Sequence, residues 1–192
     1  MLQQKESSKT SLGSLYAFAG VGEGDYGYDV AAAPSDANGA VGTSQYMQWV
    51  NTSFAIFAKS GTLLYGPAAG NTLWADLVND PVFSACATTN DGDPIVKYDQ
   101  LAKRWLVTQM SFTSGLDNFL CVAVSEGDQV GSSGALGRWN RYSINYGPFL
   151  PDYPKLAIWP SVYFLTVNLY SRVGGFFRLK APRCARWTAT SC

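Results

Sequence analysis

Short apolar runs of strand length alternate with turn sequences along most of the chain. The clearest case lies near the middle, where the turn Asn90–Asp93 precedes the apolar run Pro94–Tyr98, and a polar loop separates this run from a second one, Trp105–Met110. Short runs that are rich in β-branched and aromatic side chains, and that are bounded by Gly, Pro, Asn or Asp, are typical of β-strands. The pattern predicts an all-β domain of short antiparallel strands.

The same order of turn, apolar strand and aromatic-led strand occurs three times. The turns contain Asp36, Asp93 and Asp152, which are 57 and 59 residues apart, and an aromatic residue opens the second strand 10 to 12 positions later in each case. We therefore predict a β-propeller-like fold with about three four-stranded antiparallel blades, which together form an incomplete propeller. The predicted blades lie near residues 36–65, 91–145 and 152–180.

The remaining segments are predicted to be less regular. We expect residues 1–19 to be a disordered leader, residues 20–171 to form the partial propeller, and residues 172–192 to be an irregular basic tail. Between the first two blades, the apolar stretch Leu73–Val78 predicts a short helix. The Gly-rich segment Gly127–Gly137 is predicted to be a flexible surface loop.

The composition supports the β prediction and narrows the functional classes. Aromatic residues make up 14% of the 192 residues and charged residues 15%, while 19 Gly and 9 Pro are spread along the chain. This mixture suits pleated strands joined by many turns. The formal net charge is zero, but all 14 acidic residues lie at or before Asp152 and five basic residues lie in the last 21 positions. Elsewhere the basic residues are scattered singly, which argues against a nucleic-acid-binding surface.

The sequence has no clear pattern of a membrane span, a signal peptide or a metal cluster. No apolar run approaches the ~20 residues of a membrane-spanning helix, so we expect no membrane span. The N-terminal stretch lacks a signal-peptide core. The four cysteines have no C-x-x-C spacing, which argues against a zinc site. A disulfide between Cys86 and Cys121 would fit an exported protein, and the alternative is two reduced, buried cysteines.

The last residues do not continue the predicted blade pattern. From Ala181 to Cys192 the sequence has no acidic residue and no strand-like alternation. Three blades also leave unpaired edges, which propellers of about four to eight blades avoid by closing. We therefore expect the chain to be a truncated or frame-shifted piece of a longer propeller, with Cys184 and Cys192 outside its native disulfide framework.

Several motifs resemble those of a known class of domain. They are residues 36–42 with Tyr46–Asn51, residues 92–99 with Arg104 and Trp105, and residues 152–155 with Trp159 and Pro160. Over about residues 30 to 171 the chain is similar to the propeller-type domain of large exported bacterial proteins, and more distantly to sialidase-like propellers. The resemblance implies a propeller that is extracellular or at the cell surface. The Ser-x-Asp-x-Gly-x-x-x-Trp box of sialidases is absent, so the resemblance implies no catalytic residues.

The polar residues of the three turns indicate a common binding site. In a propeller the first strand of each blade lines the central channel, so the segments before these strands converge at one mouth of the channel. Their oxygens suit a Ca²⁺ ion bound by Asp36, Asp93 and Asp152, or the hydroxyl groups of a glycan. The alternative is that each side chain only caps its own turn. The predicted ligand-binding residues are Asp36, Asn38, Asp91, Asp93, Asp152 and Tyr153.

The sequence gives little support to an enzyme. It contains no His, which removes Ser–His and Cys–His pairs and the commonest zinc ligands. A carboxylate pair such as Asp93 with Asp152 still suits glycoside hydrolysis. We predict a non-catalytic binding or scaffold propeller of an exported or cell-surface bacterial protein, whose partner is a glycan or another protein domain and whose one candidate cofactor is Ca²⁺. The alternative is part of a glycoside-hydrolase-like, sialidase-type propeller enzyme.

Overall fold

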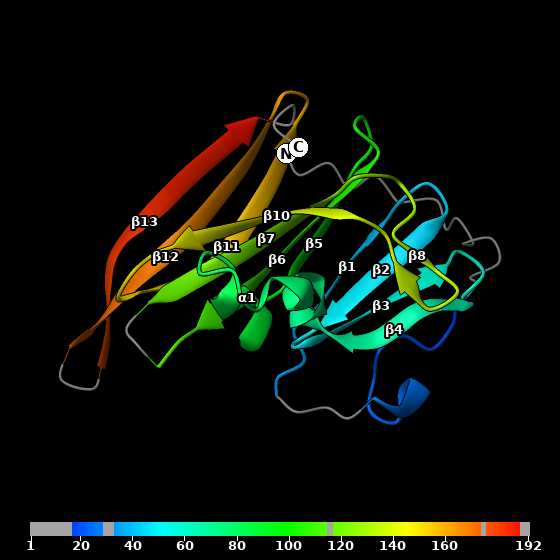
Figure 1. Ribbon diagram of the computed structural model, residues 1–192, viewed down its shortest axis with the longest axis horizontal. Coiled ribbons are helices and arrows are strands. Elements are labelled where there is room, and N and C mark those ends of the chain that lie inside the picture. The colour runs from blue at the N-terminus through cyan, green and yellow to red at the C-terminus, as the bar shows by residue number, and fades with distance from the viewer. Residues whose placement is uncertain (1–16, 29–32, 115–116, 174–175, 189–192) are drawn as a thin grey trace, which may run out of the picture.

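A computed structural model of the chain describes residues 17–28, 33–114, 117–173 and 176–188. The described strands pair antiparallel in three larger sheets and one two-stranded sheet (Figure 1). The all-β prediction is therefore confirmed. The predicted leader lies outside the described residues up to residue 16.

The first two larger sheets are meanders in which the strands pair in chain order, with a short hairpin inserted before the last strand of the second sheet. The first sheet has the order β1-β2-β3-β4 and the second has the order β10-β7-β6-β5. The strands of the first sheet are β1 (Ala37–Val41), β2 (Gln45–Val50), β3 (Ser53–Ala58) and β4 (Leu63–Ala69). Those of the second are β5 (Ile95–Asp99), β6 (Arg104–Phe112), β7 (Asn118–Ser125) and β10 (Trp139–Asn145). Two of them, β5 and β6, lie close to the strands predicted at Pro94–Tyr98 and Trp105–Met110.

The third sheet extends into the region that the sequence predicts to be irregular. Its order is β11-β12-β13, with β11 spanning Phe149–Trp159, β12 Val162–Val173 and β13 Phe176–Thr188. The prediction of an irregular tail from residue 172 is therefore wrong for residues 176–188, which pair with β12 along their length. Most described side chains of β13 are exposed, so the strand has no alternation of apolar and polar positions by which a sequence pattern would reveal it.

Short elements connect the sheets. They are the 3-10 helices η1 (Asp25–Gly27) and η2 (Gly70–Leu77), the helix α1 (Ser84–Thr88), and the hairpin of β8 (Gly131–Ser132) and β9 (Ala135–Leu136). The helix predicted at Leu73–Val78 is thus present as η2. The loop predicted to be flexible contains β8 and β9 and is fastened to the first sheet, because the Gln45 side chain donates to the Gly131 carbonyl (2.6 Å) and accepts from the Val130 N–H (2.8 Å).

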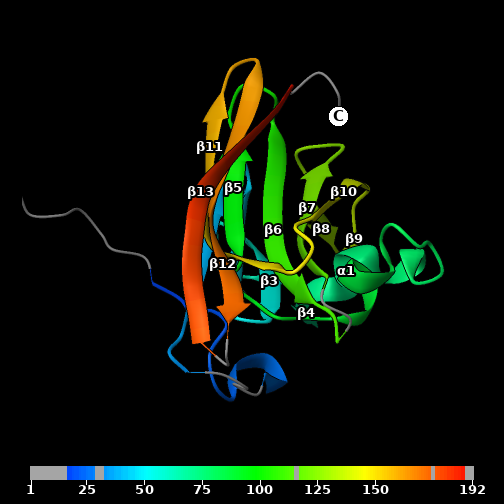
Figure 2. The ribbon, with the colours of Figure 1, turned by 90° about the vertical axis from the view of Figure 1, so that its left-hand side faces the viewer.

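The three sheets pack face to face, and the second sheet contributes side chains to both interfaces (Figure 2). Trp105 packs with Trp49 of the first sheet, whereas its neighbour Leu106 packs with Tyr163 and Leu165 of the third. Successive residues of a strand point to opposite faces, so one strand supplies both cores. All five side chains are at most 1% exposed. Truncating a buried Trp of this kind to Ala costs about 3–5 kcal/mol.

The first strands of the three sheets are neighbours in space. β5 contacts β1 on one side and β11 on the other. The contact with β1 includes a hydrogen bond of 2.8 Å from the Val96 N–H to the Asn38 side-chain oxygen. This arrangement brings the beginnings of β1 and β5 close to the middle of β11.

A disulfide joins Cys86 of α1 to Cys121 of β7, as predicted, with the two Cα atoms 5.8 Å apart. Because the two sulfur atoms are bonded, the alternative of two reduced thiols is wrong. Both cysteines are fully buried. Cys184 in β13 is a free, exposed thiol. Cys192 lies outside the described residues.

Residues 17–28 cover part of the far face of the first sheet. Val21 and Tyr28 are buried against Val50 and Phe57.

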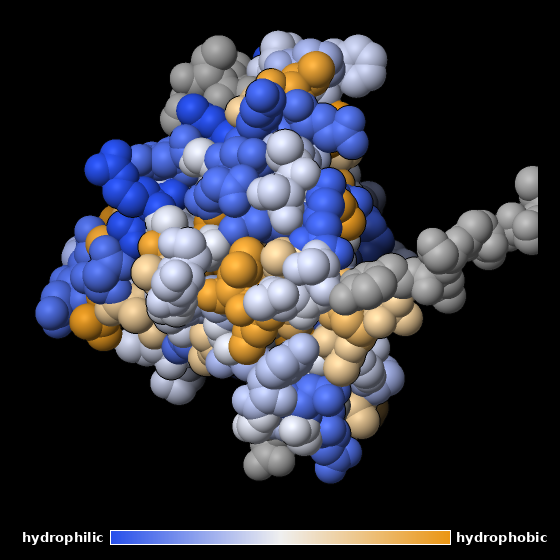
Figure 3. All heavy atoms as spheres, turned by 90° about the vertical axis from the view of Figure 1, so that its right-hand side faces the viewer, coloured by the Kyte–Doolittle hydropathy of each residue, from blue (hydrophilic) through white to orange (hydrophobic). Residues whose placement is uncertain are grey.

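The side of the molecule with β4 and β8 has hydrophilic residues over its upper part and hydrophobic residues near its middle (Figure 3). Among the described residues, no helix has the length and hydrophobicity that crossing a membrane requires.

Candidate functional site

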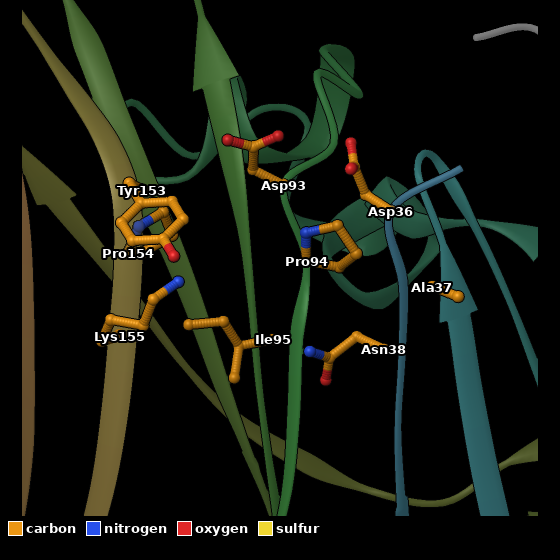
Figure 4. A pocket seen from close by; sticks show the side chains of 9 residues that line it. All are labelled: Asp36, Ala37, Asn38, Asp93, Pro94, Ile95, Tyr153, Pro154 and Lys155. Atoms are coloured by element: carbon orange, nitrogen blue, oxygen red, sulfur yellow. The ribbon is translucent and has the colours of Figure 1, made fainter. Parts of the chain in front are cut away.

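A pocket of about 250 Å³ lies where the beginnings of β1 and β5 meet the middle of β11. Each of these three regions contributes three consecutive residues: Asp36–Asn38, Asp93–Ile95 and Tyr153–Lys155. Figure 4 shows Asp36, Asp93 and Tyr153 at the same end of the three strands, with Asn38, Ile95 and Lys155 further along. Four of the six predicted ligand-binding residues therefore line one pocket: Asp36, Asn38, Asp93 and Tyr153.

The backbone explains why Asp93 and Tyr153 occupy matching places. Both residues have a left-handed conformation, with φ of 46° and 53°, and both immediately precede a proline, Pro94 or Pro154. The regular pairing of β11 with β12 is interrupted between Asp152 and Lys155, which leaves Tyr153 and Pro154 in an irregularity of the strand. Tyr153, and not Asp152, is therefore the structural counterpart of Asp93.

Two of the predicted residues support the fold through hydrogen bonds. The Asn38 side-chain oxygen accepts the bond from the Val96 N–H, so it joins the first sheet to the second. Asp91 accepts a hydrogen bond of 2.7 Å from the Phe112 N–H and does not line the pocket. For Asp91 the alternative role, in which the carboxylate satisfies a backbone group, describes the structure better than ligand binding.

Asp36 has a partner on one carboxylate oxygen. The Asn51 amide donates to Asp36 Oδ2 (3.2 Å) and also to the Pro34 carbonyl (3.0 Å). Asn51 follows β2 directly, so it links the end of that strand to the segment before β1. The bond orients the Asp36 side chain, which lies at the same end of the strands as Asp93 (Figure 4).

Asp93 is the electrostatic centre of the pocket. Burial raises the pKa of its carboxyl, the carboxylates of Asp152 and Asp36 raise that pKa further, and Lys155 acts in the opposite direction. No hydrogen bond between described side chains or backbone groups uses the Asp93 carboxylate. Asp152 is thus near Asp93 although it does not line the pocket. A carboxylate held close to other carboxylates is stabilised by a hydrogen-bond donor or a positive charge.

Lys155 is a site residue that the sequence analysis did not single out. Its ammonium group lies 3.3 Å from the centre of the Tyr153 ring, a cation–π contact between residues two apart. Tyr153 is 64% exposed, so much of its side chain remains accessible to a ligand. The signal in the sequence was the period of two in a strand, which places residues 153 and 155 on one face.

The geometry does not supply a preformed Ca²⁺ site. Among the residues that the structure describes, no group of three or more Asp, Glu, Cys or His side chains is close enough to hold a metal ion. The ammonium of Lys155 also lines the pocket and disfavours a second cation. Binding of Ca²⁺ by Asp36, Asp93 and Asp152 stays a prediction that this arrangement does not support.

Comparison of the chain with protein-family models, with curated proteins and with solved structures gave no match. The class of ligand is therefore inferred from the side chains that line the pocket. Asp36 and Asp93 offer carboxylate oxygens as acceptors, Lys155 offers a donor, and Tyr153 offers an accessible aromatic ring. This combination suits a small ligand that carries several hydroxyl groups on an otherwise apolar ring face.

Proposed function

We propose that the chain is a binding or scaffold unit of a β-propeller in an exported or cell-surface protein, and that its pocket binds a glycan without catalysis. The single observation that carries the proposal is the pocket itself, to which the same three positions of three successive sheets contribute. Two features of the fold also support a propeller: the first strands of the three sheets are neighbours, and the first two sheets are meanders. The blades of a propeller are four-stranded meanders arranged around an axis.

The side chains favour a glycan over a metal ion as the ligand. Sugar hydroxyls donate to carboxylates, and the apolar face of a sugar ring packs on an aromatic side chain. Asp93 needs a donor, and Tyr153 is exposed beside it. Lys155 donates to a ring or hydroxyl oxygen of a sugar but repels Ca²⁺.

The disulfide supports export. Disulfides form and persist in oxidising compartments such as the cell exterior and are rare in reducing ones. The Cys86–Cys121 bond is buried within the core next to α1 and β7. A binding propeller that works outside the cell is consistent with this bond.

An array of neutral and acidic oligosaccharides tests the proposal. We expect the oxidised chain to bind a subset of neutral glycans. Asp93→Asn and Tyr153→Asn should each weaken that binding by roughly tenfold or more, because each removes one charge-assisted hydrogen bond or one stacking contact. Asn tolerates the left-handed backbone at both positions, so these variants keep the local fold.

The controls match each variant. Tyr26→Asn replaces another exposed tyrosine with positive φ, which contacts Phe57 and does not line the pocket. Glu23→Gln neutralises an exposed carboxylate that also does not line it. Neither change should alter glycan binding. If no glycan binds, or if Asp93→Asn and Tyr153→Asn bind like the controls, the glycan function is wrong. Release of sugar from an array hit by the wild-type chain, lost in Asp93→Asn, would instead favour the hydrolase.

A further inference from the structure

The chain contains two Asp–Pro peptide bonds, Asp80–Pro81 and Asp93–Pro94. A carboxyl group is a nucleophile, and the side chain of Asp can attack its own backbone carbonyl carbon and close a cyclic anhydride. The proline nitrogen has no N–H in the peptide and leaves as a secondary amine, which is strongly basic. Asp–Pro bonds are for these reasons the peptide bonds that acid breaks most easily. The fold gives the two bonds of this chain different surroundings.

Asp93 is held in a strained backbone conformation two residues before β5. Its φ of 46° is left-handed, which is unfavourable for a residue other than glycine, and the proline that follows restricts its backbone further. Cleavage of the bond to Pro94 releases this constraint, so the strain lowers the barrier to cleavage. Asp80 does not have a positive φ, and its carboxylate is tied to the following turn by a hydrogen bond of 2.8 Å from the Val82 N–H.

The carboxyl group of Asp93 is available to react. It makes no hydrogen bond to any group that the structure describes. The ionisable groups around it are Asp36 beside β1, and Asp152, Tyr153 and Lys155 of β11. Burial and the two carboxylates raise the pKa of Asp93, while Lys155 lowers it. The neutral carboxyl, which can give its proton to the proline nitrogen, therefore persists to a higher pH than in an exposed Asp.

The disulfide spans the Asp93–Pro94 bond. Cys86 precedes this bond and Cys121 follows it, so residues 1–93 and 94–192 would stay covalently linked after cleavage. Strand β5, which begins directly after Pro94, is also paired with β6 along its length. The product is then a two-chain molecule that keeps its sheets. Cleavage after Asp80 has a different outcome, because residues 1–80 contain no cysteine.

We propose that the chain cleaves its own Asp93–Pro94 bond at mildly acidic pH and becomes a disulfide-linked two-chain protein. A side-chain oxygen of neutral Asp93 bonds to the Asp93 carbonyl carbon, the bond from that carbon to the Pro94 nitrogen breaks, and the side-chain proton moves to that nitrogen. Water then hydrolyses the anhydride, which leaves two carboxyl groups on Asp93 and a free secondary amine on Pro94. The net reaction consumes one water molecule, and it does not require a bound glycan.

Mass spectrometry of the purified, oxidised chain after incubation at about pH 4.5 and about pH 7 tests the proposal. At the lower pH we expect the non-reduced protein to gain the mass of one water molecule, and reduction to release fragments 1–93 and 94–192. Cleavage should be slower at the higher pH, where less of the Asp93 carboxyl is neutral. The Asp80–Pro81 bond is a control within the same molecule, and it should break at least about tenfold more slowly.

Two variants and an unfolded sample separate this reaction from ordinary acid hydrolysis. Asp93→Asn has no acidic proton and should lose the cleavage, whereas Asp80→Asn should keep it. In concentrated urea at the same pH the strain is lost, so both Asp–Pro bonds should break at similar rates. Circular dichroism identifies the lowest pH at which each protein is folded, and the rates are compared there.

Three results would overturn the proposal. The first is a folded wild-type chain that stays intact between Asp93 and Pro94. The second is cleavage of both Asp–Pro bonds at similar rates in the folded chain, which would show ordinary acid lability only. The third is cleavage between residues 93 and 94 that continues unchanged in Asp93→Asn, which would point to a contaminating protease.

Discussion

Loss of the Cys86–Cys121 disulfide should lower the stability of the folded chain by about 3.8 kcal/mol. The bond closes a loop with a sequence separation of 35 residues. In the chain-entropy description, a loop of this length removes roughly 13 cal/mol/K of entropy from the unfolded chain, which is about 3.8 kcal/mol at 25 °C. For a domain of this size we expect the Tm to fall by roughly 8–15 °C.

Urea unfolding of the oxidised and the reduced chain measures this loss without changing any side-chain volume. The double variant Cys86→Ala with Cys121→Ala should lose at least as much, because it also removes two fully buried sulfur atoms. Cys184→Ala is the control, since Cys184 is exposed and free, and it should unfold like the wild type. A difference below about 1 kcal/mol between the oxidised and the reduced chain would refute the reasoning.

Two other predictions concern the core and the pocket. Gly70→Ala should lower the free energy of unfolding in urea by about 1–3 kcal/mol or more, because the new methyl group would clash with Gln109 Oε1 and the Trp49 ring. Gly127→Ala, with open space around it, should cost little. The raised pKa of Asp93 favours the protonated carboxyl in the folded state, so the free energy of unfolding should fall as the pH rises from about 4 through that raised pKa. Asp93→Asn should remove this fall. The urea unfolding curves of the wild type and the variant should nearly coincide near pH 3 and separate toward pH 7, where the variant should be the more stable protein. A wild type that is more stable than the variant at pH 7 would contradict the raised pKa of Asp93.

The strands of the first two sheets could be predicted from the sequence because their burial produces local patterns of apolar residues. Strands β6 and β7 are packed on both faces, so most of their residues are apolar and the runs end at polar turns. The Cys86–Cys121 pair was also predicted: Cys121 lies within the apolar run of β7, and Cys86 shortly precedes the turn before β5. Asp36, Asp93 and Tyr153 were identified because similar polar residues recur at matching places in the three sequence repeats.

Other features depend on partners that are distant in the sequence. The Asn38 side chain bonds a backbone group 58 residues away, and that of Asp91 one 21 residues away, so their structural roles have no local signal. The alignment of acidic residues favoured Asp152, whereas the backbone conformation before each proline selects Tyr153. Strand β13 was missed because pairing with β12, and not burial of its own side chains, holds it in place.

The pocket at the three first strands is the centre of this account, and an NMR titration with a glycan selected on the array tests it most directly. We expect the largest shifts of backbone amides at Asp36–Asn38, at Asp93 and Ile95, and at Tyr153 and Lys155, with saturation at a single stoichiometric site. The Asp93→Asn variant should show the same spectrum away from the pocket and weaker shifts within it. Shifts that centre on another surface, or that are equal in the variant, would contradict the assignment of this pocket as the binding site.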